Sequence, residues 1–243
     1  EFRRVLFRSR MSEEEFMEED FDEEVIIDDD GDDDIDFEIP SDYENGLEIG
    51  GEIPHNKEDD KKDELFERFN PKSSAAIRLV EDFRSIQKSN PKDIGFSANP
   101  KKDNLFVWEV RLFGFEKNTP IYNDIQKYKK MTGKDYIEFE VYFPPNYPEY
   151  PPFVRVVQPR FQFHKGRVTV GGSICNDILT MESWKPVYEI ESLLLNVFTE
   201  ILAGDPRLDL SYNYPYSLQE AKDAFIRVAR DHGWKTSNWL PKE

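Results

Sequence analysis

Cysteine and histidine are scarce in this chain. Cys175 is the only cysteine among 243 residues, and the histidines are His55, His164 and His232. A single thiol can form neither an internal disulfide nor a zinc site built from several thiolates, so we expect no metal and no cofactor. No apolar run approaches the roughly 20 residues that cross a bilayer, and no segment resembles a secretory signal. These absences predict a soluble protein without membrane contact, located in the cytoplasm, the nucleus or both.

The net charge of −18 is distributed unevenly. Residues 11–64 hold 26 Asp or Glu against three Lys, and they show no helical periodicity. Such a segment cannot bury enough apolar surface to offset chain entropy, so we predict an acidic disordered tail. Residues 1–10 precede the first methionine and are too charged for a signal peptide, so we interpret them as a non-native leader. Residues 65–243 are nearly neutral, which argues against nucleic-acid binding.

The tail contains one apolar patch, formed by Val25, Ile26 and Ile27 directly before an Asp run. The patch resembles a SUMO-interacting motif, which can add a strand to the sheet edge of a SUMO-like partner. Scattered Val and Ile are also common in solvated acidic tails. Both interpretations stay open.

Alternating apolar and polar residues predict strands in the remaining sequence. The pattern is clearest over 137–143, and it also covers 106–112 and 153–157. Residues 114–133 form a polar segment longer than a hairpin needs, which we interpret as an insertion. Residues 161–181 lack strong periodicity, so we expect an extended loop that carries Cys175.

Helical spacing of apolar residues predicts three helices. The first starts near Ser73 and stops at Asn90-Pro91. The second has a wide apolar stripe over 190–202. The third begins with a capping box, Ser217 to Glu220, and ends near Gly233. Together with the strands they predict an α+β domain.

Three short motifs follow one another in this domain. They are Tyr147-Pro148-Glu149-Tyr150-Pro151-Pro152, then Gly172-Ser173-Ile174-Cys175, then Trp184-Lys185-Pro186. In this order and spacing they resemble the core of the ubiquitin-conjugating enzymes, over about residues 73–234. The resemblance implies the UBC fold for a catalytic domain at 65–243: an N-terminal helix that meets the activating enzyme, a four-stranded antiparallel meander sheet, the cysteine loop and C-terminal helices.

The same resemblance implies a function for the motif residues. Cys175 accepts ubiquitin from the ubiquitin-activating enzyme as a thioester and passes it to an amine, usually a lysine, alone or with a ubiquitin ligase. Two loops are implied to face the ligase or ubiquitin; they contain Tyr147, Pro148, Glu149 and Pro151 in the first and Trp184 and Pro186 in the second. The resemblance also implies a cis peptide bond between Tyr147 and Pro148.

The chain departs from the family at one catalytic motif. Most members carry His-Pro-Asn starting ten residues before the cysteine, where this chain has Lys165-Gly166-Arg167 with His164 one residue earlier. The Q subfamily also lacks that motif, and this chain resembles it at 152–157, 171–175, 190–192 and 207–209. We therefore identify the chain as a Q-type member.

The missing asparagine leaves open how the oxyanion is stabilised. A backbone N–H pair near Cys175 or the Asn176 side chain is the candidate donor, although a loop asparagine is also a common turn former. We expect His164 to hold the loop by a hydrogen bond rather than act as a base. The family keeps an acidic residue after the helix that follows the cysteine, and the resemblance places it at Asp209 or Asp205. We take Asp209 as the candidate acid that helps the incoming lysine lose its proton, since Asp205 in Gly-Asp-Pro is expected to form a turn.

Other functions remain as alternatives. Cys175 can be a buried structural cysteine. A cysteine peptidase would need a base beside the thiol, and His164 is the one candidate. An RWD-like interaction domain shares the fold but lacks the cysteine loop. A conjugating-enzyme variant without activity, serving as a protein-interaction module, is also consistent with the missing His-Pro-Asn.

Overall fold

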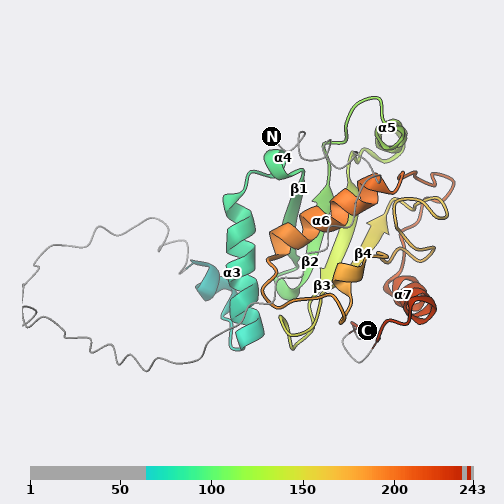
Figure 1. Ribbon diagram of the computed structural model, residues 1–243. Helices are drawn as coiled ribbons and strands as arrows, with labels where there is room; N and C mark the ends of the chain where they lie inside the picture. The colour runs from blue at the N-terminus through green and yellow to red at the C-terminus, as the bar shows by residue number, and fades with distance from the viewer. Residues whose placement is uncertain (1–63, 237–239, 242–243) are drawn as a thin grey trace, which may run out of the picture.

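The computed structural model describes residues 64–236 and 240–241. Its centre is a four-stranded antiparallel sheet in the order β1-β2-β3-β4 (Figure 1). The strands are β1 Phe96–Lys101, β2 Asn104–Leu112, β3 Ile137–Tyr142 and β4 Phe153–Gln158. The predicted leader, nearly all of the predicted acidic tail and the patch at Val25, Ile26 and Ile27 lie outside the described residues. The predicted domain boundary therefore stays a prediction.

The helices surround this sheet. After a helical stretch over 64–69, they are α3 Ser74–Lys88, α4 Pro91–Ile94, α5 Pro120–Thr132, the 3-10 turn η2 Asp177–Leu179, α6 Ile190–Ala203 and α7 Leu218–His232. The predicted start of α3 is confirmed, because the Ser73 side chain accepts from the Ala76 N–H at 3.1 Å. The predicted capping box of α7 is also present between Ser217 and Glu220. The α+β meander predicted from the sequence is confirmed.

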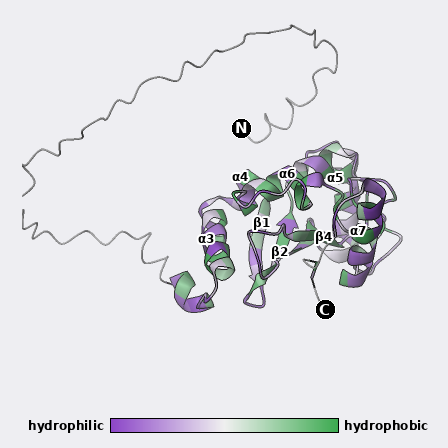
Figure 2. Cartoon of the chain, turned by 60° about the horizontal axis from the view of Figure 1, so that its bottom comes forward, coloured by the Kyte–Doolittle hydropathy of each residue, from purple (hydrophilic) through white to green (hydrophobic). Residues whose placement is uncertain are grey.

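The inner face of the sheet packs against α6. The Phe198 ring of α6 lies 5.4 Å from the Phe96 ring of β1 and 5.0 Å from the Phe139 ring of β3, measured between centroids. Figure 2 shows that α3 and α7 carry both hydrophobic and hydrophilic residues. Such amphipathic helices cover a core with one face and meet water with the other.

The opposite face of β4 packs against α7. The Phe153 ring on β4 lies 5.7 Å from the Phe225 ring on α7, within a second apolar cluster that includes Ala221 and Ala229. Phe153 points away from the inner face, since neighbouring strand residues alternate between the two faces. The sheet therefore carries α6 on one side and α7 on the other (Figure 1).

Two elements were not predicted as such. The polar segment 114–133 contains α5, which Thr119 caps at one end and Gly133 closes in the left-handed conformation at the other. Its buried residues include Ile121, Ile125 and Tyr128, a helical spacing spread too thinly among lysines to be noticed. The interpretation of this segment as an insertion did not include a helix.

Strand β1 was also not among the three residue ranges predicted as strands. It joins β2 through a tight turn at Lys102 and Asp103, both of which have a positive φ. Pro100 near the strand end hides the alternation in the sequence. Among the described residues, no helix is long and apolar enough to cross a membrane.

Candidate active site

Cys175 lies at the end of a small hairpin. Val168 pairs with Ile174 in an antiparallel bridge, and the Cys175 N–H donates to the Arg167 carbonyl at 2.9 Å. The Thr169 N–H donates to the Ser173 carbonyl at 2.9 Å and closes the turn. Cys175 is half-buried, so its side chain is partly accessible from solvent.

The hairpin packs against β4 and α7 at two glycines. The Val156 N–H on β4 donates to the Gly172 carbonyl at 2.8 Å. A Cβ on Gly171 would lie 2.1 Å from the Glu220 carbonyl oxygen in the first turn of α7. Gly172 has a φ of +91°, and a Cβ there would lie 2.6 Å from the Tyr216 ring. The two glycines therefore allow α7 and the segment before it to touch the cysteine hairpin.

Asn176 stabilises the turn after the cysteine. Its Oδ1 accepts from the Ile178 N–H at 3.1 Å and caps η2. Its Nδ2 donates to Oδ1 of Asn196 on α6 at 3.2 Å. The turn-forming interpretation of Asn176 is thus confirmed, and its amide keeps a second N–H beyond this bond. Its role as an oxyanion donor stays a prediction.

Burial and a nearby acid raise the pKa of the Cys175 thiol. Desolvation is the main cause, the Asp177 carboxylate adds to it, and the Arg167 guanidinium partly offsets both. No histidine of the described residues is among the groups that shift this pKa. The arrangement is unlike that of a peptidase, whose base must lie within hydrogen-bond reach of the thiol.

Asp177→Asn is expected to lower the pKa of Cys175 because it removes a charge that disfavours the thiolate. Iodoacetamide alkylation of Cys175 should then be up to about fivefold faster below the thiol pKa, since a partly exposed charge interaction contributes roughly 0.2–1 kcal/mol. The rate is measured against pH by mass spectrometry. Arg167→Gln should move the profile to higher pH, and a shift in the same direction for both variants would contradict the electrostatic explanation.

His164 is exposed and has a φ of +56°. Its ring stacks on the exposed Phe163 ring, with centroids 3.8 Å apart. The loop-holding hydrogen bond expected of its side chain is not found among the described residues. The stacking and the left-handed backbone define its position instead.

The two candidate acids lie in the segment after α6. The Asp209 N–H donates to the Arg160 carbonyl at 2.8 Å, and its Oδ1 accepts from the Ser211 N–H at 3.0 Å. Asp205 has a φ of +49°, as expected for a turn, and pairs with Lys165. That ion pair holds the pKa of Asp205 below its ordinary value. The catalytic role of Asp209 stays a prediction.

The two predicted partner-facing loops are joined by buried aromatic residues. The Trp184 Nε1 donates to the Pro148 carbonyl at 2.7 Å, and the Tyr147 hydroxyl donates to Asp82 of α3 at 2.7 Å. Tyr147 and Trp184 are only 2% and 5% exposed. They therefore hold the loops in place, and the cis bond expected between Tyr147 and Pro148 is present.

Helix α3 also binds the second loop. The Arg78 guanidinium donates to the Pro186 carbonyl at 3.2 Å and to the Tyr188 carbonyl at 2.9 Å. It also pairs with Asp82, whose pKa is raised by burial despite this charge and the Tyr147 hydroxyl.

Other residues of the two loops are exposed and could contact a partner, unlike the buried Tyr147 and Trp184. Glu149 is exposed, whereas Pro151 is buried. Val187 directly follows Pro186 and is 79% exposed. The sequence did not single out Val187, because an isolated valine carries no motif; its exposure is the signal that identifies it as a candidate contact residue.

Comparison with known proteins supports the motif assignment. Residues 78–232 match the family model described as "Ubiquitin-conjugating enzyme". The chain is 31% identical to ubiquitin-conjugating enzyme E2 Q1 of Homo sapiens over 192 residues, which cover 77% of this chain and 44% of that protein. It is 32% identical to ubiquitin-conjugating enzyme E2 25 of Caenorhabditis elegans over 170 residues, or 67% of this chain and 43% of that protein.

A shorter relative is matched over most of its length. This protein of Mus musculus, named as a Q-like ubiquitin-conjugating enzyme, is 31% identical over 140 residues, which cover 55% of this chain and 83% of that protein. The chain spans less than half the length of the two longer relatives. All three names agree with the family, and two of them with the subfamily, that the motifs predicted.

Proposed function

Because the chain belongs to the ubiquitin-conjugating enzyme family, we propose that it carries ubiquitin as a thioester on Cys175 and transfers it to a substrate amine. The observation that supports this most is the placement of Cys175. Its half-buried thiol ends a hairpin backed by β4 and precedes a turn capped by Asn176. A fixed, accessible thiol is what repeated acyl transfer requires.

The proposed reaction has two half-reactions. In the first, the Cys175 thiol gives up its proton and its sulfur attacks the ubiquitin thioester of the ubiquitin-activating enzyme. A new C–S bond forms, the old one breaks, and the activating enzyme's thiolate leaves and takes up a proton. In the second, an amine nitrogen attacks the new thioester, so that a C–N bond forms and the C–S bond to Cys175 breaks. The amine gives up a proton, and the departing Cys175 thiolate takes one up. The raised pKa of Cys175 favours that final protonation.

Oxyanion support is proposed to come from Asn176. The Cys175 N–H already donates to the Arg167 carbonyl, so it cannot serve without losing that bond. The Asn176 amide uses one N–H toward Asn196 and has another for a developing negative charge. A single donor of this kind typically contributes about 10²–10³ in rate.

A second candidate function is a non-catalytic interaction module. The observation that favours it is Lys165-Gly166-Arg167 in place of the family's His-Pro-Asn. An inactive variant would still present the exposed Glu149 and Val187 loops to partners. The two functions differ in one observable: whether Cys175 becomes loaded with ubiquitin as a thioester.

Glu149→Phe is expected to increase binding to standard RING or HECT ligases at least several-fold. Glu149 is exposed in the first loop, and an acid entering an apolar pocket loses hydration without compensation. Binding is measured by pull-down or calorimetry with an isolated RING domain. Glu116→Phe, a second exposed position, serves as the control for non-specific hydrophobic binding. Unchanged or weaker binding by Glu149→Phe would exclude this role for the first loop.

The proposed function is tested by incubating the chain with ubiquitin-activating enzyme, ubiquitin and ATP. A reductant-sensitive adduct on a non-reducing gel is expected for the wild type. Its chase onto free lysine should release the thiol and form lysyl-ubiquitin. Failure to form an adduct with ubiquitin or any related modifier would favour the interaction module.

A further inference from the structure

Three chain segments lie side by side next to Cys175. The cysteine segment is bonded to 160–168 through the Cys175 N–H and the Arg167 carbonyl at 2.9 Å. The segment 160–168 is in turn bonded to 204–209. The Gly166 N–H donates to the Gly204 carbonyl at 2.8 Å, and the Gln162 N–H donates to the Arg207 carbonyl at 2.9 Å. The segment 204–209, which contains both candidate acids, is therefore connected to the Cys175 segment through one intervening loop segment.

Helix α5 anchors the outer segment of this arrangement. Asp124 on α5 is 3% exposed, and its Oδ2 accepts from Arg207 Nε at 2.7 Å and from the Leu208 N–H at 3.2 Å. The Arg207 Nη2 also donates to the Asp124 Oδ1 at 3.3 Å. The bonds come from both the side chain and the main chain of the outer segment. They fix its direction as well as its position.

Asp124 also depends on the segment 204–209, because a buried carboxylate requires hydrogen-bond donors. The hydrogen bonds that Asp124 accepts from other elements come from Arg207 and Leu208, and its further cation, Lys127 on the same helix, lies 3.9 Å away. Helix α5 itself is fixed by a cap at each end and by buried Ile121 and Ile125. The capped helix thus adds an attachment to a loop that is also bonded to 160–168 and whose Leu208 lies in the core.

We propose that α5 positions the segment 205–209 for the transfer of ubiquitin to an amine, with Asp124 and Arg207 as positioning residues that act through Asp209. This inference rests on the proposed function of Cys175. The first half-reaction involves the cysteine hairpin, which β4 and α7 support independently through Gly171 and Gly172. The second needs the amine to be oriented and to lose a proton, for which a fixed carboxylate is suited.

The test separates the two half-reactions. Wild type, Asp124→Asn and Arg207→Gln are charged with ubiquitin, the thioesters are isolated, and each is discharged onto free lysine or onto hydroxylamine. Hydroxylamine is largely uncharged at neutral pH, so unlike lysine it need not lose a proton before it attacks the thioester. Both variants should charge normally and discharge onto lysine about 10- to 100-fold more slowly, as expected for a misplaced catalytic group. Discharge onto hydroxylamine should stay within about twofold of wild type.

Two controls accompany this comparison. Lys129→Ala removes the exposed ion pair with Asp135 at the other end of α5 and should leave both discharge rates unchanged. Asp209→Asn should reproduce the lysine defect, and combining it with Asp124→Asn should add little, because residues acting as one unit are not additive. The defect of Asp124→Asn should also shrink as pH rises, since a free amine then loses its proton unaided.

Three results would overturn the inference: equal slowing onto lysine and hydroxylamine, no slowing of either, or fully additive effects of Asp124→Asn and Asp209→Asn. Each would mean that Asp124 only supports the fold or is dispensable. A wild type that never becomes charged would instead overturn the proposed function, and the inference with it; that failure appears at the charging step, before any discharge is measured.

Discussion

Gly171→Ala is expected to destabilise the folded domain by about 3 kcal/mol, at the upper end for overpacking in a protein interior. The added methyl would lie 2.1 Å from the Glu220 carbonyl oxygen and 2.8 Å from the Ala224 Cβ, both on α7. Backbone atoms of a helix cannot move aside as a flexible side chain can. Helix α7 must separate from the cysteine hairpin, and charging of Cys175 should weaken with it.

The comparison for this variant is Gly133→Ala at the end of α5. A Cβ there meets nothing within 4 Å, but the φ of +79° disfavours a side chain, so the expected cost is about 1 kcal/mol. Urea unfolding gives both free energies. Equal losses for the two variants would show that close contact with α7 is unimportant.

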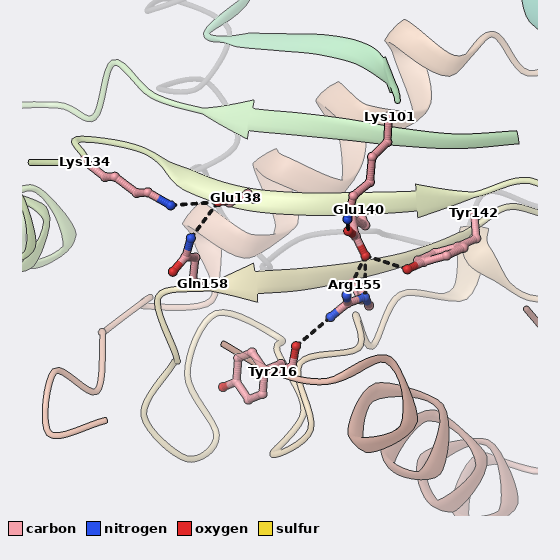
Figure 3. Close-up of polar contacts among 8 residues, drawn as sticks. All are labelled: Lys101, Lys134, Glu138, Glu140, Tyr142, Arg155, Gln158 and Tyr216. Atoms are coloured by element: carbon pink, nitrogen blue, oxygen red, sulfur yellow. Dashed lines mark hydrogen bonds and ion pairs between the residues drawn. The ribbon is translucent and has the colours of Figure 1, made fainter. Parts of the chain in front are cut away.

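Arg155→Met is expected to cost about 3–5 kcal/mol at neutral pH, because it removes the buried guanidinium that pairs with the buried Glu140 carboxylate. Figure 3 shows the network on the outer face of the sheet. The Arg155 Nε donates to Glu140 at 3.0 Å, its Nη1 donates to the Tyr216 carbonyl at 2.9 Å, and Lys101 and Tyr142 also bond Glu140. Arg155 therefore connects the sheet to the segment that precedes α7.

The stability lost in Arg155→Met should be largest at neutral pH and smaller in acid. Burial alone raises the pKa of Glu140, but the bonds from Lys101 and Tyr142 and the charge of Arg155 together hold it below the ordinary 4.5. In the wild type, the lowered pKa of Glu140 stabilises the folded state at pH values above the ordinary pKa of 4.5. This stabilisation is lost as the pH falls through the lowered pKa of the folded protein. Without Arg155 the pKa rises, so the difference between variant and wild type should be largest at neutral pH and shrink in acid.

Arg68→Met is the matched control for this prediction. Its pair with Asp103 is exposed on both sides, and such pairs contribute about 0–1 kcal/mol. Unfolding by urea is measured for both variants from neutral pH to about pH 4. A loss for Arg155→Met no larger than that for Arg68→Met would contradict the importance of the buried network.

The sequence predicted those elements whose periodicity is set by burial. Helix α6 carries a continuous apolar stripe, and α7 begins with a capping box that forms with local partners only. Strand β3 alternates cleanly because one of its faces packs on α6. Helix α5 was missed since lysines separate its few buried residues, and β1 since Pro100 and Asn99 interrupt its pattern.

In the candidate site, too, features with a local sequence pattern were predicted and features that depend on tertiary packing were not. Cys175 and the two aromatic loops were identified because short motifs carry them. The contacts of Asp124 with Arg207, 83 residues apart, and of Asn176 with Asn196 depend on tertiary packing that no local pattern encodes. Gly171 and Gly172 were noticed only as loop residues; their contacts with α7 and Tyr216 explain why side chains are excluded there.

The central claim is that Cys175 carries ubiquitin, and intact-mass measurement of the charged chain tests it most directly. After incubation with ubiquitin-activating enzyme, ubiquitin and ATP, the wild type should gain one ubiquitin and lose it on addition of a thiol reductant. Cys175→Ser should gain the same mass as an oxyester that survives the reductant, and Cys175→Ala should gain none. A wild type that stays uncharged, or an adduct that persists on Cys175→Ala, would contradict the account.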